Sequence, residues 1–108
     1  MGRKPNNLDI VFSAVSDPTR RAILENLKKG KMCASDIAVP FQISLPAVSK
    51  HLKILESAKL IVREKQGRVH FFHLDAYPIR EAIEWMNKYK EFWETQLDAL
   101  ENFFEEGD

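Results

Sequence analysis

The chain has 108 residues, and its 16 Lys and Arg are balanced by 16 Asp and Glu, so the formal net charge is zero at pH 7. We expect residues 1–108 to form a single domain, with a modest core that a second chain would enlarge. A hydrophobic content of 44% excludes a disordered or collagen-like chain, and there is no run of 18 apolar residues that could span a membrane. Cys33 is the lone cysteine, which excludes an internal disulfide. The N-terminal stretch has no apolar secretory segment, so we expect a cytoplasmic protein.

The neutral total hides a separation of charge along the chain. Residues 1–74 carry thirteen Lys and Arg against six Asp and Glu, whereas residues 75–108 carry three against ten. Halves of opposite sign indicate a basic surface for a polyanion and an acidic part held away from it. For the acidic half alone, a long solvated helix that collects carboxylates is the simpler explanation.

The first part of the chain predicts three helices in succession. Asp17 caps the second, which Gly30 follows, and Pro40 closes a short third helix over about 35–39. Asn7 can cap the first helix. Its apolar residues recur at i, i+3, i+4 and i+7 and are Leu8, Val11, Phe12 and Val15.

A fourth helix carries residues that point to function. Ser44 caps it, and no acid occurs before Glu56 near its end at about Ser57. Its buried side is predicted by the helical spacing of Leu45, Val48, Leu52 and Leu55. The other side is small and basic, which lets the backbone approach base edges while hydroxyl and ammonium groups bond to bases or phosphates. The expected DNA contacts are Ser44, Pro46, Ala47, Ser49, Lys50, His51 and Lys53.

After Lys59 the apolar period changes from 3.6 to 2, which predicts a β-hairpin over about 60–74 with its turn at residues 66–68. Helices, a turn, a further helix and a hairpin in this order describe a helix-turn-helix with a wing. Basic residues cluster near the tip, and a projecting basic hairpin suits the phosphate backbone or the minor groove. A solvated face would explain two lysines alone, but not their agreement with this hairpin. The expected contacts are Arg63, Lys65, Gln66 and Arg68.

A long helix is predicted over about 78–106. At the usual rise per residue it would be roughly 40 Å long, whereas a compact chain of about 100 residues has a radius of gyration of only about 13 Å. Its apolar residues alternate spacings of three and four, with Gln96 the one polar interruption. This aromatic density favours burial against a second chain over folding back on its own domain. The expected interface residues of this helix are Ile79, Met86, Tyr89, Trp93, Leu97, Leu100 and Phe103.

The segments SDPTRRAILENL and DIAVPFQISLPAVSKHLKILESAKLIVREKQGRVHFFHL, with the Trp-bearing terminal helix, resemble the ArsR/SmtB family of bacterial repressors. The resemblance covers nearly the whole chain. It implies a mainly α winged helix-turn-helix fold with a small β-hairpin, with the helix-turn-helix at about 33–58 and the wing at about 60–74. It also implies a homodimeric repressor that binds an operator and is generally released by an effector. The first helix is then expected to join the dimer interface through Leu8, Val11 and Phe12.

The chain departs from the metal sensors of that family. Where such sensors often read ELCVCDLA, this chain reads KMCASDIA, and one thiolate at Cys33 cannot close a soft-metal site. Its terminal helix has no histidine, and His70 and His73 are expected on opposite faces of a strand. We therefore expect no metal and no cofactor, and we interpret Cys33 as a small residue at a helix start.

Other interpretations stay open. Arg20 and Arg21 could touch phosphate, although pairing with Asp17 or Asp36 is expected first. The chain could instead be a sensor with a small-molecule pocket at the dimer seam, or a winged protein–protein adaptor. An enzyme is disfavoured because no nucleophile–base pair, phosphate loop or paired carboxylates can be assigned. For a dimeric regulator, the two fourth helices would lie about 34 Å apart, which predicts an inverted-repeat operator and leaves an unidentified effector possible.

Overall fold

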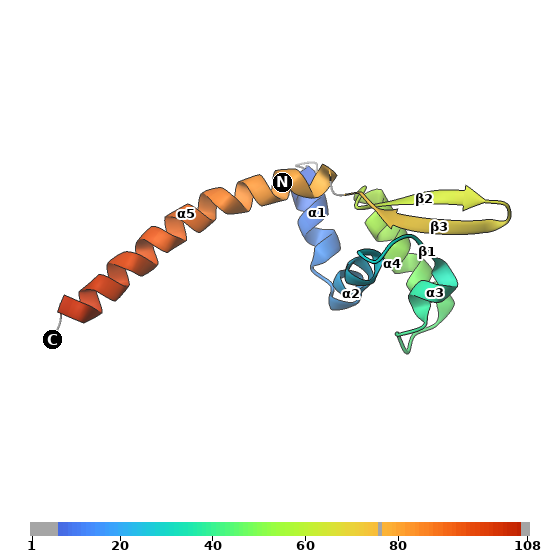
Figure 1. Ribbon diagram of the computed structural model, residues 1–108, viewed down its shortest axis with the longest axis horizontal. Coiled ribbons are helices and arrows are strands. Elements are labelled where there is room, and N and C mark those ends of the chain that lie inside the picture. The colour runs from blue at the N-terminus through green and yellow to red at the C-terminus, as the bar shows by residue number, and fades with distance from the viewer. Residues whose placement is uncertain (1–6, 76, 107–108) are drawn as a thin grey trace, which may run out of the picture.

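The computed structural model describes residues 7–75 and 77–106. Within them the chain forms α1 (Asn7–Val15), α2 (Pro18–Leu27), β1 (Met32–Cys33), α3 (Ala34–Ala38), α4 (Leu45–Ser57), β2 (Ile61–Gln66), β3 (Val69–Leu74) and α5 (Tyr77–Glu106). Residues 7–75, here called the body, lie at one end of the molecule, and α5 projects away from them (Figure 1). The predicted winged helix-turn-helix is confirmed. Much of the N-terminal stretch on which the expectation of no export rests lies outside the described residues.

Side-chain caps fix where two of the helices begin. The backbone N–H of Arg20 donates to Oδ2 of Asp17 at 3.1 Å, and the backbone N–H of Ala47 donates to Oγ of Ser44 at 3.3 Å. Both cap residues have extended backbone angles, and each helix has a proline in its first turn. Asn7 already belongs to α1, so the prediction that it caps this helix is wrong.

The chain leaves α4 through a tight reversal that aims it into β2. The N–H of Leu60 donates to the carbonyl of Leu55 at 3.0 Å, and the N–H of Lys59 donates to the carbonyl of Glu56 at 2.9 Å. This pair of bonds is the Schellman arrangement, which needs a left-handed residue just past the helix. Lys59 supplies it with φ of 61°, at a position where glycine is usually found.

The sheet has strand order β1-β3-β2 with antiparallel pairing. Gln66 pairs with Val69, which leaves Gly67 and Arg68 as a two-residue turn, so Gln66 belongs to a strand and not to the turn predicted at 66–68. Gly67 has φ of 65°, as tight hairpin turns of this length require. The sequence did not predict β1, which has only two residues, opposite Phe71 and Phe72.

The core lies where α1 to α4 pack on the sheet. Fully burying one valine, leucine, isoleucine or phenylalanine side chain in such a core stabilises the fold by about 1.5–3 kcal/mol. Only Ala82 comes from α5 among the buried core residues of the described chain, which are Val11, Ala14, Ile23, Leu27, Ile37, Val48, Leu52, Leu55, Ala58, Leu60, Ile61, Phe72 and Ala82.

The long terminal helix gives the molecule its shape. With α5 projecting, the radius of gyration is 18.8 Å and the longest extent is 67 Å. Its first turns pack on α1, where the rings of Phe12 and Trp85 meet edge to face at 5.6 Å. Farther along, α5 does not fold back on the body (Figure 1), and the side chain of Trp93 is 56% exposed. None of the described helices, α5 included, combines the length and apolar content that a membrane span needs.

Candidate nucleic-acid interface

One side of α4 is open to solvent and free of acidic groups as far as Glu56. The buried side chains of Val48, Leu52 and Leu55 fix the rotation of this helix on the core. That rotation turns outward most of the residues expected to contact DNA, while Ala47 and His51 are half-buried. The exposed ones are Ser44, Pro46, Ser49, Lys50 and Lys53.

A groove of about 680 Å³ runs between α1 and α4. Lys50 and Lys53 line its α4 side together with Ile54, and Ser13 and Ala14 line its α1 side. The two lysines therefore lie close to the helix that also reaches α5. A change in the position of α1 relative to α4 would alter the shape of this surface.

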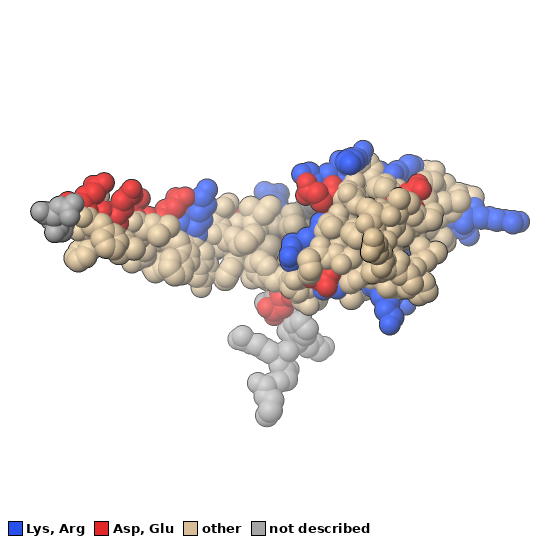
Figure 2. Space-filling model, turned by 90° about the horizontal axis from the view of Figure 1, so that it is seen from below, with Lys and Arg blue, Asp and Glu red and all other residues tan. Residues whose placement is uncertain are grey.

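The β2–β3 hairpin extends from the side of the body that is opposite to α5 (Figure 1). Lys65, Gln66 and Arg68 are exposed at or next to its turn. In Figure 2 a basic side chain reaches out from this end of the molecule, while acidic side chains follow one edge of the outer part of α5. The separation of charge along the sequence is thus also a separation in space.

Arg63 does not lie at the tip of the hairpin, contrary to the sequence interpretation. It pairs in register with Phe72, well back along the strand, and its guanidinium lies over that ring at 5.1 Å. Its Nη2 also donates to Oε1 of Glu56 on α4 at 2.9 Å. Arg63 therefore ties the hairpin to the end of α4, while the three residues near the turn are left for an outside partner.

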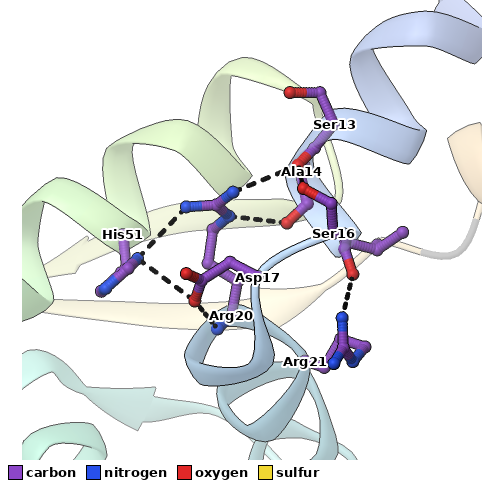
Figure 3. A network of polar contacts seen from close by, with 8 residues as sticks. Ser13, Ala14, Ser16, Asp17, Arg20, Arg21 and His51 are labelled. Carbon is purple, nitrogen blue, oxygen red and sulfur yellow. Dashed lines mark hydrogen bonds and ion pairs between the residues drawn. The ribbon is translucent and has the colours of Figure 1, made fainter.

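A polar network joins α1, α2 and α4 (Figure 3). Arg20 donates through Nε to the carbonyl of Ala14 at 2.6 Å and through Nη2 to the carbonyl of Ser13 at 3.1 Å. Its Nη1 lies 3.3 Å from Nδ1 of His51, and the neighbouring Arg21 donates to the carbonyl of Val15 at 2.9 Å. The predicted pairing of these arginines with Asp17 or Asp36 is not formed as a close ion pair: both side chains bind the carboxyl end of α1, and Arg20 acts on Asp17 only as a nearby charge.

Asp17 completes this network. Its carboxylate accepts a hydrogen bond from the backbone N–H of Arg20, which stabilises the charged form and holds the pKa of Asp17 below its usual value. His51, with Nδ1 3.9 Å from Oδ2 of Asp17, acts in the same direction. The half-buried ring of His51 thus faces α2, so this residue is separated from the exposed side of α4.

The sequence could not identify the arginine contacts because their acceptors are backbone carbonyls, which any residue type supplies. The one available signal was positional. Two arginines lie five and six residues beyond Val15, the last residue of α1, and α1 has no basic residue in its own last turn. The negative end of a helix dipole attracts cations, so this spacing could have suggested the contact.

The residues near Cys33 do not fit a soft-metal site. Its Sγ lies 3.3 Å from Oγ of Ser35, a hydroxyl group where a second thiolate would be needed. In the register of the hairpin, His70 lies opposite Lys65 and His73 opposite Val62, so the two rings point to opposite faces of the sheet. Nowhere in residues 7–75 and 77–106 do three His, Cys, Asp or Glu side chains form a group that could hold a metal.

The outer part of α5 presents a second uncovered surface. One side of the helix carries a set of exposed apolar side chains, here called the aromatic face, which the described part of the chain leaves largely uncovered. Figure 2 shows that side free of charge along the outer helix, with the acids on the other edge. Its members are Trp85, Met86, Tyr89, Phe92, Trp93, Leu97, Leu100, Phe103 and Phe104.

The other residues expected at a dimer interface are closer to the body. Leu8, Phe12 and Ile79 are partly buried against the core. Val11 is only 2% exposed and packs inside its own chain, so it is removed from the set that could face a partner.

Comparisons with known proteins agree with this architecture. Residues 17–62 match the model of the family described as bacterial regulatory protein, arsR family. The chain is 46% identical over 76 residues to the transcriptional repressor SdpR of Bacillus subtilis strain 168, and the aligned segment covers 70% of this chain and 84% of that protein. It is 33% identical over 81 residues to an arsenical resistance operon repressor of Staphylococcus xylosus, covering 75% of this chain and 74% of that one.

Solved structures give the same result. A crystal structure of an ArsR family transcriptional regulator superposes with a TM-score of 0.76 and 37% identity, covering 87% of this chain and 97% of the other. An ArsR-like transcriptional regulator from Rhodococcus sp. RHA1 superposes with a TM-score of 0.70 and 28% identity, covering 90% and 92%. The chain therefore belongs to the ArsR family of bacterial regulatory proteins, and it is a DNA-binding transcriptional regulator.

Proposed function

We propose that the chain is a homodimeric repressor that places the exposed side of α4 in the major groove of an inverted-repeat operator. The observation that carries this proposal is the acid-free outer surface of α4, held in one orientation by Val48, Leu52 and Leu55. A rigid helix with small and basic outer side chains suits base edges and phosphates. The two relatives described above are named repressors, which supports repression over activation.

The hairpin supplies contacts beside the groove. Lys65, Gln66 and Arg68 reach the phosphate backbone or the minor groove, while Arg63 holds the hairpin against α4. Phosphate contacts release counterions, so the affinity should fall steeply with salt. A nearly salt-independent affinity would contradict this role of the hairpin.

The second copy would cover the aromatic face of α5. A continuous exposed apolar surface made of nine large side chains is unusual on a monomer. Leu8 and Phe12 of α1 extend the surface toward the body. Twofold association would set two α4 helices about 34 Å apart, one turn of DNA. A regulator of chromosomal DNA would then act in the bacterial cytoplasm.

The direct test removes the two lysines of α4. In a Lys50→Ala/Lys53→Ala variant, we expect operator affinity to fall by about tenfold or more while the dimer remains intact. The matched control is Lys28→Ala/Lys29→Ala, which removes the same charge from exposed positions after α2. The operator comes from selection of bound fragments of the source genome, and affinity is measured by fluorescence anisotropy at several salt concentrations. Equal affinities for the two variants would reject the assignment of α4.

The second candidate function is the binding of a small-molecule effector. A hollow of about 600 Å³ lies between α1, the end of α4 and the start of α5, with Ile10, Tyr77 and Glu81 in its walls. Because these walls join the proposed dimer helices to α4, a ligand bound there would affect both association and DNA contact. A ligand-induced rise in melting temperature without DNA, followed by loss of operator binding, would support this role.

A further inference from the structure

We propose that Arg20 is a positioning residue for DNA binding, which sets the placement of α4 relative to α1. The inference rests on the proposed function, because it assigns α1 to the dimer and α4 to the DNA. Arg20 contacts both helices from a third one, α2 (Figure 3). It would therefore transmit the position of the dimer partner to the helix that contacts bases.

The contacts of Arg20 with α1 are those of a helix cap supplied by another helix. The last carbonyls of a helix have no partner within it and carry the negative end of its dipole. Nε and Nη2 of Arg20 bind the carbonyls of Ala14 and Ser13 there. A guanidinium group has a planar fork of N–H groups that can bind two such acceptors at once.

The contact of Arg20 with α4 is made through His51. An arginine can only donate, so Nδ1 of His51 must accept the hydrogen bond from Nη1 across their 3.3 Å separation. The neutral ring then carries its proton on Nε2. Asp17, whose Oδ2 lies 3.9 Å from the same Nδ1, is the alternative partner of the ring if Arg20 is removed.

The space between α1 and α4 makes this link consequential. The groove between the two helices is open, so side-chain packing does not fill it. Lys50 and Lys53 line the groove on α4, and they lie on the same helix as His51. A loss of the Arg20 link would let α4 shift relative to α1, and the two copies of α4 in a dimer would no longer keep their spacing.

A direct contact of Arg20 with DNA is disfavoured by its geometry. Its Nε, Nη1 and Nη2 are already bound to acceptors within the chain, and the residue is half-buried. Arg21 provides the matched control because it is adjacent, carries the same charge and binds α1 through the carbonyl of Val15. Its side-chain hydrogen bond reaches α1 but not α4.

The first experiment compares Arg20→Lys with Arg21→Lys. A lysine keeps the charge but cannot span three acceptors, so Arg20→Lys should lower operator affinity by about tenfold with the dimer dissociation constant unchanged. Arg21→Lys should stay within about twofold of the natural chain. The slope of affinity against salt should be the same for all three proteins. If Arg20→Lys lowers that slope by about one contact, Arg20 binds phosphate and the proposal is overturned.

Two substitutions at His51 provide a rescue test. His51→Asn keeps an acceptor oxygen near the place of Nδ1, whereas His51→Leu removes it. We expect His51→Asn to retain most of the operator affinity and His51→Leu to behave like Arg20→Lys. Equal losses in both would mean that the ring itself contacts DNA, and equal retention would mean that the link to α4 has no role. Either result overturns the proposal.

A measurement without DNA separates this inference from the proposed function. The ¹⁵N chemical shifts of a histidine ring report which nitrogen carries the proton, and the chain has only three histidines. In the natural chain, the neutral ring of His51 should carry its proton on Nε2, because Nδ1 accepts from Arg20. In Arg20→Ala the proton should move to Nδ1, facing Asp17, and in Arg21→Ala it should not move.

The outcomes are distinguishable. If the natural chain binds no genomic fragment while the His51 tautomer responds as expected, the link exists but the proposed function fails. If the natural chain binds its operator and Arg20→Lys binds as well as Arg21→Lys, the positioning role fails and the proposed function stands.

Discussion

The body and α5 solve the problem of apolar burial in opposite ways. Residues 7–75 enclose nearly all of the core, and the apolar side chains of α4 that face inward are almost fully buried. Beyond its first turns, α5 has no core of its own and leaves the aromatic face exposed. A monomer is therefore complete at one end and incomplete at the other, and the incomplete end is also the acidic one.

This difference separates two tasks that the charge pattern also separates. Basic groups on α4 and the hairpin face outward from the body, where a polyanion can approach. The acids of α5 are held away from that surface, and between them the aromatic face offers burial to a second chain. We expect changes in α5 to alter association first and changes in the body to alter DNA affinity or folding.

The largest effect should come from a charge placed within the aromatic face. Trp93→Glu would bury a carboxylate at the seam and remove an aromatic anchor, so we expect the dimer to weaken by about a hundredfold or more. Thr95→Glu adds the same group on the other side of α5 and should leave association nearly unchanged. Sedimentation equilibrium measures both. A Trp93→Glu variant that dimerises like the natural chain would show that the aromatic face of α5 is not the dimer interface.

A smaller effect should come from the contact between the hairpin and α4. Removing a carboxylate close to DNA ordinarily raises affinity, but Glu56→Gln also weakens the bond that holds Arg63. We expect its operator affinity to fall by about threefold, since the pair is partly exposed to solvent. Glu64→Gln on the same hairpin is the control and should not lower affinity. A rise in affinity for Glu56→Gln would show that Arg63 is a DNA contact that Glu56 restrains.

A substitution at the tight turn after α4 should raise the stability of the body without changing the proposed DNA-binding surface or the aromatic face. Lys59 adopts a left-handed conformation that glycine accepts without steric cost. Lys59→Gly should therefore stabilise the body by about 0.5–1 kcal/mol in urea unfolding. Lys29→Gly, after the end of α2, is the control for the loss of a lysine. A destabilised Lys59→Gly variant would mean that the side chain of Lys59 matters more than its backbone angle.

The smallest effect concerns acid stability. The folded chain holds the pKa of Asp17 below its unfolded value, so the carboxylate stabilises the body above the unfolded pKa. That contribution is lost as the pH falls through the lower, folded value. Asn caps a helix about as well as Asp but does not titrate. The melting temperature of Asp17→Asn should thus fall less than that of the natural chain between about pH 5 and pH 2.5. Parallel curves for the two proteins would contradict this.

The sequence predicted the elements that carry their own start signals. Asp17 and Ser44 mark the beginnings of α2 and α4 because their side chains cap the adjacent backbone, which is a local interaction. The period of the apolar residues predicted α5 and both strands of the hairpin. Strand β1 was missed because a two-residue strand has no period and exists only through its pairing with β3.

The candidate site was predicted in composition but not in its internal contacts. Lys50 and Lys53 are exposed as the helical spacing required, whereas Leu45, which that spacing placed on the buried side, is 49% exposed. Arg63 was misplaced because its neighbours depend on strand register, which follows from the two-residue turn at Gly67. Arg20 was assigned the wrong partners because carbonyl groups of α1 leave no mark in the sequence.

The uncovered aromatic face has a consequence for how the protein responds to its own abundance. Where most copies are single, the concentration of pairs rises with the square of the total amount, so halving synthesis reduces pairs about fourfold. For the proposed dimeric repressor, a promoter under its control would be released sharply when production drops, even with no inducer in the cell.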